Sequence, residues 1–79
     1  MLQIGSPKIK AIQAKIDDQT IDGIHFKVRK AMGFTIQVAH DAENDEKAKA
    51  VLKKAIAAIP EAKNVYTNIQ YIDEKGHIL

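Results

Sequence analysis

The residues best suited to chemistry gather in the stretch 24–40, which reads IHFKVRKAMGFTIQVAH. Apolar and polar side chains alternate, and this alternation is interrupted once in the middle of the stretch. The pattern is typical of two strands with one face in a core. The polar positions of this stretch are His25, Lys27, Arg29, Thr35 and Gln37. Cations and hydrogen-bond donors of these types contact phosphates and other anions, so this face is the first candidate binding surface.

A later stretch of the chain extends that surface. Residues 65–72, VYTNIQYI, alternate in the same way and predict a strand whose Ile69 and Tyr71 face the core. The residues that alternate with them, Tyr66, Asn68 and Gln70, then lie on the polar face. The full set of predicted binding residues is His25, Lys27, Arg29, Thr35, Gln37, Tyr66, Asn68 and Gln70.

The usual catalytic patterns are missing from the sequence. The chain has no Cys, and its one serine, Ser6, stands before a proline in a predicted turn without a Gly-x-Ser-x-Gly motif. The carboxylate pairs at 17–18 and 73–74 are adjacent in predicted turns rather than opposed across a cleft. The four glycines are scattered and form no phosphate-binding loop. We expect a protein that is not an enzyme and has no cofactor.

The three histidines do not suggest a metal centre. His25 and His40 have opposite parity on the predicted hairpin, so they point to opposite faces of the sheet. His77 belongs to a third element, and no His-x3-His pair exists to anchor an ion. We therefore expect no metal site.

Length and composition indicate the number of domains and the cellular location. Seventy-nine residues make a single domain, 1–79, with one thin core. Small secreted domains usually depend on disulfides, so the absence of cysteine favours a reducing, cytoplasmic location. The N-terminus lacks the pattern of a signal peptide, and no apolar run approaches the ~18 residues that span a bilayer. The net charge of +2 selects no partner.

The clearest predicted element is a helix over 43–59. Apolar residues recur at helical spacing from Ala48 to Ile59, and acidic residues precede lysines in the order that suits the helix dipole. Pro60 ends the helix, and Asp41 or Asn44 supplies its N-cap.

Residues 24–40 are predicted to form a hairpin. A three-residue loop at 31–33, with Gly33 left-handed, keeps the apolar residues of both strands on one face. This register places Phe26 opposite Val38 and assigns Phe34 to the core. The stretch therefore departs from the RNA-recognition motif, whose third strand exposes aromatic rings that stack on bases.

The segment 7–18 fits two interpretations. Ile9, Ile12 and Ile16 have helical spacing, but lysines at the start and aspartates at the end oppose the helix dipole. As a strand with a bulge, the segment alternates, and twelve isoleucines against three leucines in the chain favour sheet. We adopt the strand.

The predicted fold is a two-layer α+β domain, in which a small antiparallel sheet packs on one long helix. The sheet is a three-stranded meander followed by one strand or hairpin. The helical interpretation of 7–18 gives instead the ferredoxin-like order β-α-β-β-α-β.

We expect the protein to act as a small non-catalytic binding module, such as an inhibitor, adaptor or assembly factor. Its partner is expected to be a protein, and open sheet edges favour self-association into a homo-oligomer. The alternative function is binding of nucleic acid or a small anionic ligand through the basic outer face of the sheet.

Overall fold

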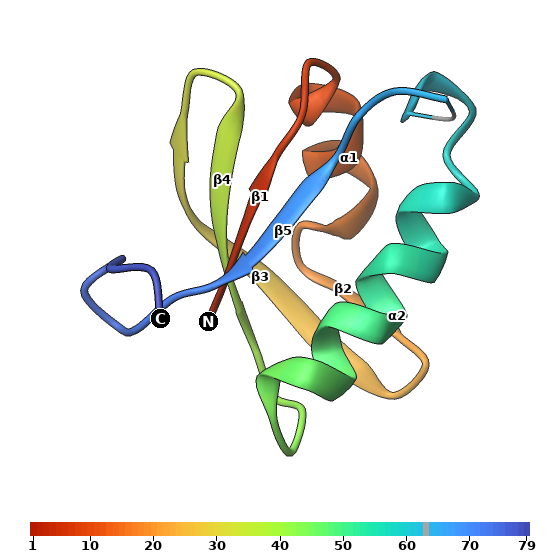
Figure 1. Cartoon of the computed structure of the whole chain (residues 1–79). Helices are drawn as coiled ribbons and strands as arrows, with labels where there is room; N and C mark the ends of the chain where they lie inside the picture. The colour runs from red at the N-terminus through yellow and green to blue at the C-terminus, as the bar shows by residue number, and fades with distance from the viewer. Residues whose placement is uncertain (63) are drawn as a thin grey trace.

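A computed structural model of the chain, which describes residues 1–62 and 64–79, shows an antiparallel sheet and two α-helices (Figure 1). The elements in chain order are β1 (Leu2–Gly5), α1 (Ile9–Ile16), β2 (Gln19–Ile21), β3 (Ile24–Met32), β4 (Thr35–His40), α2 (Asp45–Ala57), a 3-10 helix η1 (Pro60–Ala62) and β5 (Asn68–Tyr71). The five strands lie in the order β2-β3-β4-β1-β5, and all neighbours are antiparallel. None of the described helices is long and apolar enough to cross a membrane. The chain forms a small α+β domain.

Both helices lie on the same face of the sheet and share one core with it (Figure 1). Period-two alternation in the strands and helical spacing in α1 and α2 turn their apolar residues toward this core. Its members from the strands are Leu2, Ile4, Ile24, Phe26, Ile36, Val38 and Ile69, and its members from the two helices are Ile9, Ile12, Ile16, Ala48, Leu52 and Ile56. The other sheet face, the outer face, is therefore left without a helix.

The strand adopted for residues 7–18 is wrong, because the segment forms α1. Ile9, Ile12 and Ile16 are all buried against the sheet. Burying one such side chain contributes about 1.5–3 kcal/mol, whereas a charge at the unfavourable end of a helix costs about 0.3–1 kcal/mol. The three isoleucines therefore outweigh the unfavourable charge order.

Two helices, rather than one long helix, consequently cover the sheet, and the single-helix architecture is wrong. The order of elements contains the alternative β-α-β-β-α-β, with β2 as an additional short edge strand. Strands β2, β3 and β4 do form a meander of consecutive neighbours, but its first strand is Gln19–Ile21 and not the segment 7–18.

The helix predicted over 43–59 is present as α2, which is two residues shorter at each end. Its N-cap is Asn44, whose Oδ1 accepts a hydrogen bond of 2.8 Å from the backbone N–H of Lys47. Acidic residues occupy the first turn and Lys54 the last, which stabilises both ends of the helix dipole.

The predicted register of the β3–β4 hairpin is wrong by two residues. Val28 pairs with Val38 and Phe26 with His40, and the turn contains only Gly33 and Phe34. The extra residue enters as a β-bulge between Val28 and Lys30 instead of lengthening the loop. Gly33 has a φ of 53°, which suits the first central position of a two-residue type II′ turn.

The bulge leaves Phe26 in the core but places Phe34 in the turn. Because the bulge adds one residue to β3, the apolar residues of β3 and β4 face the same side of the sheet even with a two-residue turn. Phe26 and Ile36 are therefore both buried in the core. Phe26 is fully buried, but Phe34 is 69% exposed at the tip of the hairpin, so its assignment to the core is wrong.

Candidate functional site

The polar side chains of the outer face lie in cross-strand rows. One row joins Lys30, Gln37, Gln3 and Gln70, and its amides are linked by hydrogen bonds of 3.4–3.5 Å. A second row, one step nearer the hairpin turn, joins Met32, Thr35, Gly5 and Asn68. The eight predicted binding residues do not form one cluster around these rows but fall into three groups.

The first group, His25 and Lys27, lies at the β2 end and is already paired within the chain. The ring Nε2 of His25 lies 3.0 Å from Oδ1 of Asp18, and its Nδ1 contacts the Thr20 hydroxyl. Lys27 Nζ lies 3.9 Å from Oδ1 of Asp17, which also accepts the backbone N–H of Val28. These carboxylates reduce the positive charge that this group offers to an anion.

The second group lines a shallow hollow in the middle of the outer face. Arg29 and Gln37 lie there with Glu74 and with Lys30, which is not among the eight predicted residues. Gln70 belongs to the same group, because its side chain is joined to that of Gln37 through the amide of Gln3. The hollow measures about 620 Å³. Its two cations and one carboxylate give a mixed charge and no strong preference for an anion.

The C-terminal segment covers part of this face. Residues 73–76 turn back over it, and a Cβ atom at Gly76 would lie 2.8 Å from Nε2 of Gln37. Ile72 pairs with Ile78 and is only 1% exposed. The outer face is therefore less open than a bare polar sheet face.

The third group, Thr35, Tyr66 and Asn68, lies at the hairpin end of the sheet. These residues line one hollow of about 320 Å³ together with Phe34 and Pro7. Tyr66 is 76% exposed and Phe34 69%, so two aromatic rings share one concave surface.

A second hollow adjoins the first and shares Pro7 and Phe34 with it. Lys8 and Lys10, from the start of α1, line its other side. We call the combined region the tip surface. It comprises Pro7, Lys8, Lys10, Phe34, Tyr66 and Asn68.

Sequence reasoning misses most of the tip surface. It assigns Phe34 to the core because Phe34 has the parity of Ile36 and Val38, whereas in the structure Phe34 lies in the two-residue turn and is exposed. In the sequence, Lys8 and Lys10 stand out only as unfavourable helix charges, a local conflict of the kind that accumulates near functional surfaces.

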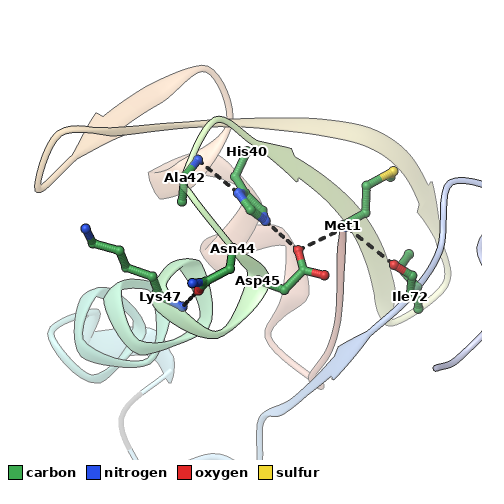
Figure 2. A network of polar contacts seen from close by, with 7 residues as sticks. All are labelled: Met1, His40, Ala42, Asn44, Asp45, Lys47 and Ile72. Atoms are coloured by element: carbon green, nitrogen blue, oxygen red, sulfur yellow. Dashed lines mark hydrogen bonds and ion pairs between the residues drawn. The ribbon is translucent and has the colours of Figure 1, made fainter.

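The most closely connected polar groups in the described part of the chain surround Asp45, at the first position of α2 (Figure 2). His40 Nδ1 accepts the N–H of Ala42 at 3.1 Å, so the ring proton lies on Nε2 and is donated to Asp45 Oδ1 at 2.6 Å. The Met1 ammonium also donates to this oxygen, at 3.1 Å, and to the carbonyl of Ile72. The contacts tie α2 to β4, β1 and the end of β5, which is a structural role.

Asp45 makes the stability of the protein depend on pH. Burial raises the pKa of its carboxyl. Hydrogen bonds from His40 and from the Met1 ammonium, together with the ammonium charge, lower this pKa by more than burial raises it, so the net pKa lies below 3.8. The stabilisation is thus complete above the unfolded-state pKa near 3.8 and is lost as the pH falls through the folded-state pKa.

We expect Asp45→Asn to remove this acid-dependent contribution. Urea unfolding at successive pH values should give a difference between wild type and variant that is largest above about pH 4 and shrinks below it. Asp73, whose pKa the backbone N–H groups of His77, Lys75 and Gly76 also lower, is present in both proteins and cancels. A difference that does not change with pH would contradict this assignment, and Asp22→Asn, in an exposed turn, is the control.

The described residues contain no cluster of three or more His, Cys, Asp or Glu side chains able to hold a metal ion. The Ser6 hydroxyl accepts a hydrogen bond from the N–H of Lys8 and so belongs to the turn before α1. The surfaces described above present aromatic rings, amides and cations to a binding partner.

Comparisons of the chain with protein-family models, with curated proteins and with solved structures find no match.

Proposed function

We propose that the protein is a small non-catalytic binding module that acts by protein–protein contact and self-associates through the outer edge of β5. The observation that carries this proposal is that β5 is an edge strand. It ends the sheet and pairs with another strand, β1, on one side only. Unpaired backbone groups at a sheet edge accept a strand from another chain.

The hydrogen-bond pattern identifies which groups are available. Ile72 exchanges hydrogen bonds with Met1, so by alternation Gln70 and Asn68 bond to β1, whereas Ile69 and Tyr71 direct their backbone groups away from it. Leu79 donates its N–H to the carbonyl of Tyr71. The C-terminal segment already adds to this edge in an extended form, and the backbone groups of Ile69 remain for another strand.

The charges of the sheet edges favour β5 over the opposite side. Residues 65–72 carry no charged side chain, so two copies of β5 meet no like-charge repulsion. On the opposite side, β2 has three residues, and β3 continues beyond it with Arg29, Lys30 and the bulge. Short strands, charges and bulges protect an edge from pairing.

Gln70→Lys tests the proposal. We expect the wild-type protein to form a concentration-dependent dimer, and the variant to dissociate at least about tenfold more readily, because like charges juxtaposed in an interface cost several kcal/mol. Sedimentation equilibrium over a range of protein concentrations measures the change. The proposal fails if the wild type is monomeric at every accessible concentration.

Thr20→Lys is the matched control. It makes the same neutral-to-lysine change on an exposed residue at the other edge of the sheet, in β2. We expect this variant to dimerise like the wild type. Equal weakening by both substitutions would show a general charge effect and would remove the support for β5.

A further inference from the structure

We propose that the tip surface binds single-stranded nucleic acid. Bases stack on the rings of Phe34 and Tyr66, and phosphates pair with Lys8 and Lys10. The segments that carry these residues are the β3–β4 turn, the connection from β1 to α1 and the approach to β5, which lie at one end of the molecule (upper end in Figure 1). This inference does not depend on self-association through β5.

The tip surface exposes the aromatic rings of Phe34 and Tyr66. Both are more than two-thirds exposed, although burial of such rings normally contributes strongly to the stability of a small domain. They line the same hollow, which Gly5, Thr35 and Asn68 also line. Exposed aromatic rings on a concave surface are the platforms on which unpaired bases stack.

The tip surface also carries positive charge. Lys8 and Lys10 line the adjoining hollow, which shares Phe34 and Pro7 with the first. None of the described residues that line either hollow is acidic, and no carboxylate in the described part of the chain forms an ion pair with these lysines. By contrast, Lys27 is paired with Asp17. The positive charge at the tip surface is available to phosphates.

A nucleic acid fits this combination better than a protein does. Aromatic side chains occur in both kinds of interface, but lysine is depleted where proteins contact one another. Lysines beside aromatic rings are characteristic of surfaces that bind single strands, where each base offers a flat π-face and each phosphate a charge. A duplex keeps its bases stacked internally and leaves no faces for the two rings, so the ligand is single-stranded.

Fluorescence anisotropy with labelled oligo-dT, oligo-U and a mixed-sequence duplex tests the inference. We expect binding to both single strands and weaker binding to the duplex. Phe34→Ala and Tyr66→Ala should each weaken single-strand binding by roughly 5- to 140-fold, the range found when one stacked base loses its ring. Phe34→Tyr, which keeps a ring, should bind like the wild type.

The lysines are tested through the dependence on salt. The logarithm of the binding constant falls linearly with the logarithm of the salt concentration. For a single strand, each phosphate that a lysine neutralises makes this slope steeper by about 0.7. We expect Lys8→Glu/Lys10→Glu to make this slope shallower by about that amount for each phosphate no longer neutralised. Lys47→Glu/Lys53→Glu makes the same change in net charge at exposed positions of α2 and should retain the wild-type slope.

Stacking itself has a direct readout, because the chain contains no tryptophan. Phe34→Trp should fold like the wild type at this exposed position, and its fluorescence should be quenched when oligo-dT is added. Absence of oligonucleotide binding, unchanged affinity in both alanine variants, or equal affinity for the duplex would each overturn the inference. The first of these outcomes would leave the tip surface to a protein partner.

Discussion

Phe26→Ala is expected to destabilise the protein by about 3–5 kcal/mol, the usual cost of removing a buried phenylalanine. Phe26 is the largest of the fully buried side chains and lies in β3 with its ring against His40, at a centroid distance of 6.5 Å. A domain of 79 residues has a total stability of about 4–12 kcal/mol. The variant should therefore be close to unfolding, with a much lower urea midpoint and Tm.

Phe34→Ala is the matched control for this prediction. It removes the same ring from the other end of the hairpin, where the ring is exposed, and should change the free energy of unfolding by less than about 0.5 kcal/mol. Urea unfolding followed by circular dichroism measures both variants. Similar losses in the two variants would mean that Phe34 also contributes to the core, which would contradict the bulged register.

These two residues show what alternation in a sequence can and cannot predict. The pattern of 24–40 correctly predicts two strands and the burial of Phe26. It does not reveal whether an extra residue enters at the loop or within the strand, because both choices keep Ile36 on the core face. That choice decides whether Phe34 lies in the strand or in the turn, where it is exposed.

The segment 7–18 shows a different limit. Its charges argue against a helix when only the segment is considered, but in the structure Asp17 and Asp18 contact β3. Asp17 accepts the N–H of Val28 at 3.0 Å, and Asp18 pairs with the ring of His25. These contacts join the end of α1 to a separate strand and form only when the two elements pack together, so the charge order within the segment could not predict them.

The prediction of one basic face as the candidate site assumes that residues of equal parity act together. Parity does place Gln37 and Gln70 in one hydrogen-bonded row. It carries no information on distance along the strands, and the structure separates His25 from Tyr66 at opposite ends of the sheet. Nor does parity include side chains from turns and helix starts, such as Phe34 and Lys8.

His40→Ala is expected to cost about 2–4 kcal/mol of unfolding free energy, the second large effect. The His40 side chain is only 7% exposed, and its Nε2 donates to a charged carboxylate, a bond that contributes about 1.5–3 kcal/mol. Its loss also leaves the N–H of Ala42 without its acceptor and opens space beside Phe26. Urea unfolding near neutral pH measures this loss.

His25→Ala provides the comparison, because His25 also lies within hydrogen-bond distance of an aspartate. Its pair with Asp18 spans 3.0 Å, but both side chains are largely exposed, and exposed pairs contribute about 0–1 kcal/mol. We expect His25→Ala to lose less than about 1 kcal/mol. Burial, rather than the presence of an aspartate partner, then sets the contribution of each histidine, and equal losses in the two variants would refute the structural role given to the contacts around Asp45.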